Sequence, residues 1–88
     1  MSQSEQVKSK TDYLRDVTSQ VKEMQHYAQT NTEKLSSAWL AFDAGEYKDK
    51  TFAPRFETLI EQQGKLLDEF NSVIQDIEIT INHSEQEK

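Results

Sequence analysis

Few side chains in this chain could support catalysis or metal binding, because its 88 residues include two histidines and no cysteine. His26 and His83 stand far apart, and neither begins a zinc spacing such as His-Glu-x-x-His. Carboxylates such as Asp12 and Asp16 lie among polar residues, without the burial that general acid or base catalysis needs. The acidic segment 43–49 lacks the alternating oxygen ligands and the terminal Glu of an EF-hand. We therefore predict no catalytic residues, no metal site and no cofactor.

The charge balance excludes two further classes of partner. A formal net charge of −6, with ten Lys and Arg residues scattered along the chain, is unsuited to neutralising phosphates, so we expect no nucleic acid partner. The same acidity disfavours an anionic membrane surface.

No apolar run approaches the roughly 20 residues of a membrane span, and the first residues lack the features of a signal peptide.

The apolar residues recur at helical spacing in the first half of the chain. Their steps alternate between three and four residues, which is the heptad pattern of a helix that packs along one stripe. Neither Gly nor Pro interrupts this stretch, so we predict a helix over about residues 5–42. The stripe begins at Val7 and continues through Leu14, Val17, Val21, Met24, Ala28, Asn31, Leu35, Ala38 and Phe42.

A turn and a second helix follow. Gly45 is a candidate for the residue just beyond the first helix, and the turn is expected over about residues 43–51. Asp49 or Thr51 can cap the second helix, and Pro54 is tolerated only in a first turn. This helix is expected over about residues 52–81, followed by a polar tail at 82–88. Its predicted stripe contains Phe52, Phe56, Leu59, Gln63, Leu66, Phe70, Val73 and Ile77, and it is widened by Ile60, Leu67, Ile74 and Ile81.

Two stripes of matching period predict an all-α fold, an antiparallel two-helix hairpin in a single domain. With 34% hydrophobic residues, the chain has little for a core, and a domain of this length buries only about 60–65% of its unfolded surface. We therefore expect two hairpins to pair into a four-helix bundle, and Leu66→Asp to abolish association and most helicity together. Asn31 either has no specific role in a loosely packed layer or fixes the register and the choice of partner, as single polar core residues do in coiled coils. Gly64 marks either the close approach of a neighbouring helix or a tolerated surface position.

Five aromatic residues gather around the predicted turn. One interpretation is that they close the end of the hairpin; the other is that Trp39 and Tyr47 form a recognition surface, and the two are compatible. The set comprises Trp39, Phe42, Tyr47, Phe52 and Phe56.

The segment Leu35-Ser36-Ser37-Ala38-Trp39, followed by Gly45-Glu46-Tyr47 and a second amphipathic helix, resembles the Trp-x-Gly superfamily. These are small helical-hairpin proteins of bacterial type VII (Esx-type) secretion. Ala41 stands at the position of the motif glycine, and His83 stands where the family's export signal has its Tyr. The resemblance implies a dimer of hairpins that is exported without a signal peptide, with Trp39 and Tyr47 in recognition.

We predict a non-enzymatic, protein-binding hairpin that acts as a dimer, either a type VII secreted protein or the partner of one. Its partner would be a second copy or a related small helical protein, and the secretion machinery would be a further partner. The alternative is a cytosolic helical adaptor or chaperone-like subunit bound to a larger client. The predicted partner-binding residues are Leu14, Val17, Val21, Met24, Trp39, Tyr47, Leu59, Leu66, Phe70 and Val73.

Overall fold

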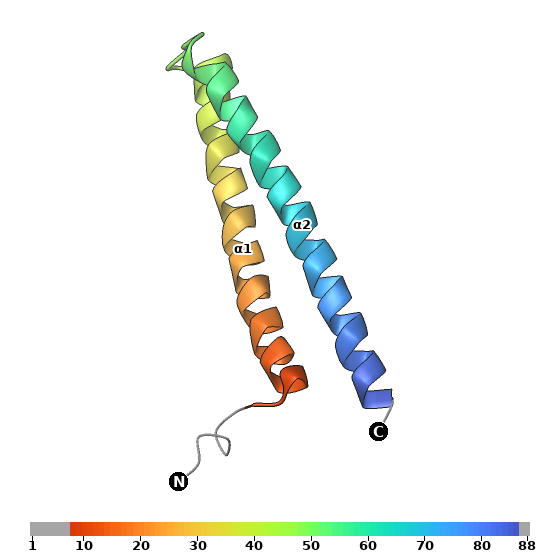
Figure 1. Ribbon diagram of the computed structural model, residues 1–88. Helices are drawn as coiled ribbons and strands as arrows, with labels where there is room; N and C mark the ends of the chain where they lie inside the picture. Colours follow the sequence, from red (N-terminus) through yellow and green to blue (C-terminus); the bar gives the residue numbers. More distant parts are fainter. Residues whose placement is uncertain (1–7, 87–88) are drawn as a thin grey trace.

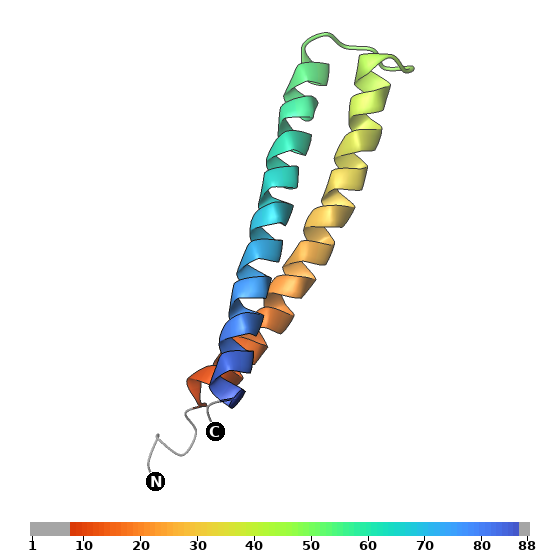
Figure 2. The same ribbon diagram turned by 90° about the vertical axis from the view of Figure 1, so that its right-hand side faces the viewer.

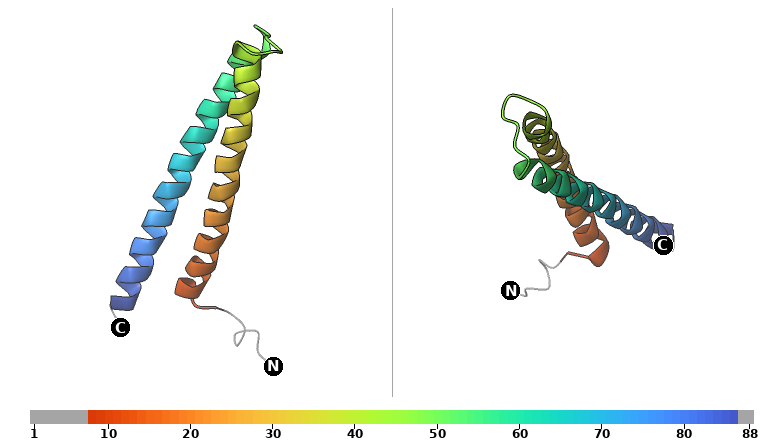
Figure 3. Two further views of the ribbon diagram at one scale, coloured as in Figure 1. Left: turned by 180° about the vertical axis from the view of Figure 1, so that it is seen from behind. Right: turned by 90° about the horizontal axis from the view of Figure 1, so that it is seen from above.

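The computed structural model describes residues 8–86, which form a hairpin of two long helices (Figure 1). Helix α1 spans Lys10–Asp43 and helix α2 spans Phe52–Gln86, and the described residues contain no strand. The chain reverses at one end, so the helices run antiparallel, as a second view also shows (Figure 2). Their axes are inclined to each other (Figure 3). The predicted all-α, two-helix hairpin is confirmed.

Helix α1 begins where a side chain caps it. The Ser9 hydroxyl accepts a hydrogen bond from the backbone N–H of Asp12 over 3.1 Å, which satisfies one of the free donors of the first turn. The predicted start near residue 5, and Val7, lie outside the described residues. Just before the cap, the Lys8 ammonium donates a hydrogen bond to the Asp16 carboxylate. This hydrogen bond and the charge of Asp16 raise the pKa of Lys8.

The bend is closed by backbone contacts around Gly45 and Asp49. Gly45 follows the C-cap residue Ala44, as predicted, and its N–H donates to the Ala41 carbonyl over 3.2 Å. The Asp49 N–H donates to the Phe42 carbonyl over 2.8 Å. The Asp49 carboxylate then accepts hydrogen bonds from the N–H groups of residues 51 and 52, over 2.8 and 3.0 Å. Asp49, and not Thr51, therefore caps α2.

Helix α2 continues to Gln86, past the predicted end at residue 81. Ile81 is buried and Ser84 is half-buried against α1, so the last turns of the helix still have one packed side. Glu85 also forms an ion pair with Arg15 across the hairpin. Polar residues on the solvent side need no burial, so they do not end the helix. The remainder of the predicted tail, residues 87–88, lies outside the described residues.

The two helices meet along a seam that differs from the prediction at every second position of α1 and is narrower than the predicted stripe on α2. The predicted inward residues Leu14, Val21, Ala28, Leu35 and Phe42 are buried or half-buried, as are Phe56, Gln63, Phe70 and Ile77. The remaining seam positions lie one residue later than predicted on α1, whereas four of the five on α2 are the residues that were predicted to widen the stripe. They are Thr18, Gln25, Thr32 and Trp39 on α1, and Ala53, Ile60, Leu67, Ile74 and Ile81 on α2.

The seam accepts threonines because their hydroxyls bond to their own helix. The Thr18 hydroxyl donates to the Leu14 carbonyl over 2.9 Å, and the Thr32 hydroxyl donates to the Ala28 carbonyl over 3.0 Å. A buried hydroxyl with a partner carries a much smaller penalty than an unpaired one. The α2 row of isoleucine and leucine is therefore buried against a half-polar row of α1. The predicted position of Asn31 in the seam was wrong, since Asn31 is exposed.

Candidate protein-binding surfaces

Ion pairs between the helices mark one flank of the seam. Lys22 Nζ lies 3.2 Å from Glu78 Oε2, and Arg15 pairs with Glu85. Each of these four residues directly follows an inward-facing residue of its own helix. These pairs join the two helices on one side of the seam. On the other side lie the residues that directly precede Thr18 and its heptad equivalents on α1, and Ala53 and its heptad equivalents on α2.

That other side is apolar along most of α2 and near Val17 and Met24 of α1, and we call it the apolar face. Five of its side chains are between 41 and 51% exposed: Met24, Phe52, Leu59, Leu66 and Val73. Neighbouring side chains of this face recur at seven-residue intervals, so they form rows along the hairpin. A monomer leaves these rows in water. The apolar face consists of Val17 and Met24 on α1, and Phe52, Leu59, Leu66 and Val73 on α2.

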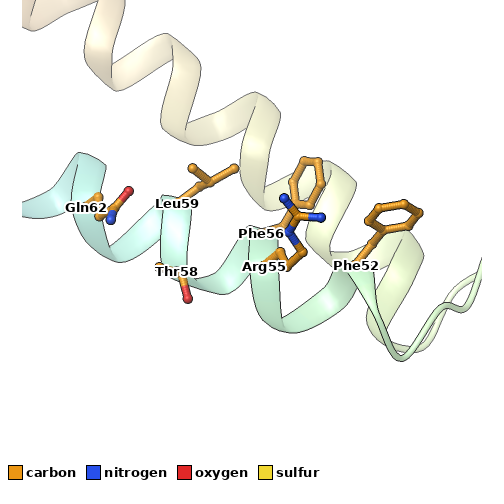
Figure 4. Close-up of a pocket in the computed structure, with 6 residues that line it drawn as sticks. All are labelled: Phe52, Arg55, Phe56, Thr58, Leu59 and Gln62. Atoms are coloured by element: carbon orange, nitrogen blue, oxygen red, sulfur yellow. The ribbon is translucent and has the colours of Figure 1, made fainter.

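Near the bend, the apolar face is hollowed. A depression of about 460 Å³ is lined by Phe52, Phe56 and Leu59, with Arg55 on its polar rim. Figure 4 shows Phe56 and Leu59 directed toward α1, whereas Thr58 points away from it. The Phe56 ring lies 5.2 Å from the ring of Phe42, measured between centroids. The phenylalanines thus close the end of the hairpin and also shape the face beside it.

The hairpin has a thin core. No large side chain among the described residues is completely buried. The radius of gyration is 19.7 Å, whereas a compact domain of this length is expected near 12 Å. In the third of α2 nearest the bend, the side-chain oxygen of Gln63 is buried without a hydrogen-bond partner. The molecule therefore has the shape of half of a larger bundle.

The predicted partner-binding residues fall into three groups. Five of them lie on the apolar face: Val17, Met24, Leu59, Leu66 and Val73. Leu14, Val21 and Phe70 are half-buried in the seam between α1 and α2, and Trp39 is half-buried in the seam near the bend. Tyr47 lies in the bend and is 69% exposed.

Two exposed tyrosines next to the apolar face were not predicted as site residues. Tyr13 stands four residues before Val17, and Tyr27 stands three residues after Met24, so each tyrosine neighbours that residue on the surface of α1. Both tyrosines lie outside the apolar stripe that was predicted for the first helix. Their spacing from Val17 and Met24 was the signal that could have identified them.

The described residues contain no group of three or more His, Asp or Glu side chains placed to hold a metal ion. Neither described helix carries an apolar stretch long enough to cross a membrane. No protein-family model, curated protein or solved structure matches the chain.

Proposed function

We propose that this protein is a non-enzymatic binding module whose apolar face packs against a second helical hairpin to complete a four-helix bundle. The observation that carries the proposal is the exposure of a row of apolar side chains of α2, next to Met24 of α1, on one side of the molecule. Burying such surface stabilises an assembly by roughly 25 cal/mol per Å². The opposite flank, which carries the ion pairs, would stay in solvent.

The surface area of the chain supports this assembly. Its accessible surface is 6959 Å², whereas a compact monomer of 10.2 kDa is expected to expose about 5,300 Å². The excess of about 1,600 Å² is twice the roughly 800 Å² that one partner contributes to an interface of standard size. Covering one long face in an interface of standard size would therefore remove about half of this excess.

Charge along the edge of the apolar face favours a second copy in the opposite direction. One row of α2 side chains changes from cationic Arg55 near the bend, through Gln62, to anionic Glu69 and Asp76 toward the chain ends. In a two-fold dimer with bends at opposite ends, Arg55 of each copy lies near Asp76 of the other. A dimer with both bends at the same end would bring the cations together, which is unfavourable.

The biological setting that we propose is bacterial type VII secretion, in which the protein is either exported or escorts an exported partner. The hairpin architecture and the position of Trp39 beside the bend support this setting. It predicts that the protein appears in culture medium without cell lysis. Retention inside cells whose type VII pathway is active would contradict it and favour the cytosolic adaptor.

The test of the apolar face compares neighbouring residues. Leu66 lies on that face, whereas Leu67 is half-buried in the seam. The earlier expectation that Leu66→Asp removes helicity is therefore replaced: we expect this variant to be a helical monomer. Leu67→Asp should unfold the hairpin. Ile79→Asp is the control, because Ile79 is 65% exposed and is not part of either flank.

Light scattering across a dilution series, combined with circular dichroism, distinguishes the outcomes. The proposal requires that wild type and Ile79→Asp form dimers and that Leu66→Asp does not. A Leu66→Asp variant that dimerises as well as wild type would refute the apolar face as the interface. If the wild-type protein is a monomer but forms a heavier complex with a related hairpin, the partner is that related protein and not a second copy of this chain.

A further inference from the structure

A second groove lies near the bend on the flank opposite the apolar face. It has a volume of about 400 Å³ and is lined by apolar side chains of Trp39, Leu40 and Ile60. Leu40 is 60% exposed, so its side chain is available to a ligand. We call this the bend groove; its lining is completed by Ser36, Glu57 and Glu61.

The bend groove belongs to the flank that carries the ion pairs. Ser36 stands two heptads after Lys22, and Glu57 stands three heptads before Glu78, and Lys22 and Glu78 are 3.2 Å apart across the hairpin. A dimer formed through the apolar face would therefore leave this groove in solvent. In an antiparallel dimer, one bend groove would lie at each end.

The rim of the bend groove carries two negative charges, those of Glu57 and Glu61. Glu57 and Glu61 are both exposed and stand four residues apart on α2, a spacing at which like charges repel each other. Lys65 stands four residues after Glu61, yet no ion pair joins Glu57 or Glu61 to it or to any other described residue. A ligand that brings positive charge would relieve this repulsion, and an acidic ligand would increase it.

We propose that the bend groove binds a helical segment of another protein that carries a large aliphatic side chain flanked by Arg or Lys. The aliphatic group would pack between Trp39 and Leu40, and the cations would pair with Glu57 and Glu61. Two glutamates one helical turn apart, about 6 Å along the axis, match two basic residues at the same spacing on the ligand. This proposal does not depend on dimer formation.

The chain contains a built-in reporter for this test, because Trp39 is its only tryptophan. The probe is a synthetic, alanine-based helical peptide of about 18 residues with one Leu between two Arg residues spaced one turn apart. Two matched peptides replace both Arg residues by Glu, or the Leu by Ala. We expect the basic peptide to shift Trp39 emission, and both matched peptides to bind at least about tenfold more weakly, with binding that weakens as salt rises.

Variants then assign the interaction to the groove. Glu57→Gln/Glu61→Gln and Leu40→Ala should each weaken binding by about fivefold or more, since all three residues line the groove. Glu23→Gln/Asp68→Asn removes two exposed carboxylates elsewhere and should bind as wild type does. Circular dichroism of each variant confirms that its helices are intact.

Three results would overturn the proposal: no emission change at millimolar basic peptide, equal binding of the acidic peptide, or unchanged binding by the Glu57→Gln/Glu61→Gln variant. If free arginine amide bound as tightly as the peptide, the groove would be a simple cation site and not a site for a helical segment. The Leu66→Asp variant separates this test from that of the apolar face. It should bind the basic peptide with unchanged affinity whether or not the wild-type protein is a dimer.

Discussion

The Lys22 ammonium lies 3.2 Å from the Glu78 carboxylate and joins the middle of α1 to the last third of α2. Both side chains are about half exposed, so the pair contributes little to the stability of the hairpin. Its main consequence is geometric. Together with Arg15 and Glu85, it gives one flank of the seam a charged character and leaves the apolar face on the other.

This ion pair gives a first prediction. Glu78→Lys should lower the free energy of unfolding by about 0.5 to 1 kcal/mol, because it replaces an attraction by a repulsion. The double variant Lys22→Glu/Glu78→Lys should recover most of that loss. Urea unfolding at low and high salt measures both effects, and the difference should shrink at high salt. If Glu78→Lys also lowered the affinity of the dimer, this flank would have to be part of the interface.

The antiparallel dimer predicts complementation between two charge-reversal variants. Arg55→Glu alone and Asp76→Arg alone should each form weaker homodimers, by about 1 kcal/mol, since each brings like charges together at both ends. A mixture of the two should form heterodimers in preference to either homodimer. Native mass spectrometry of the mixture detects this preference. Statistical mixing, with no excess of heterodimer, would contradict the antiparallel arrangement.

The two glycines should respond in opposite directions to alanine. A Cβ on Gly45 would lie 2.9 Å from the backbone Cα of Ala41, so Gly45→Ala should destabilise the hairpin by about 1 to 3 kcal/mol. A Cβ on Gly64 would meet nothing within 4 Å, so Gly64→Ala should stabilise α2 by about 1 kcal/mol. Thermal unfolding followed by circular dichroism compares the two. If Gly64→Ala destabilised the assembled protein, a partner helix would have to approach that position closely.

Asp49 should contribute to the stability of the bend through its side chain, which caps α2. Asp49→Ala removes the acceptor for the N–H groups of Thr51 and Phe52, and we expect a loss of about 1 kcal/mol. Asp49→Asn keeps a side-chain oxygen at the same position and should lose less. Urea unfolding of both variants provides the measurement. Equal losses would mean that the negative charge at the start of α2, and not the hydrogen bonds, is what stabilises the cap.

The sequence by itself determined the helices, the bend and the direction of the chain. Heptad spacing without Gly or Pro gave α1, and Gly45 and Asp49 could be identified as the residues of the turn from their chemistry alone. The shared seam residues Leu14 and Phe70 were also predictable. These features are local: they depend on residues within a few turns of each other along one helix.

Only the tertiary structure decided which of two adjacent rows faces the other helix. On α2, Leu66 and Leu67 satisfy the apolar pattern equally well, because the stripe there is wider than a two-helix seam. Burial of the isoleucine row of α2 against α1 turns Leu67 inward and leaves Leu66 on the apolar face. The threonines of α1 can occupy the seam because their hydroxyls bond to their own helix, as Thr18 does. That choice depends on how two helices pack together, which the periodicity of either one alone does not specify.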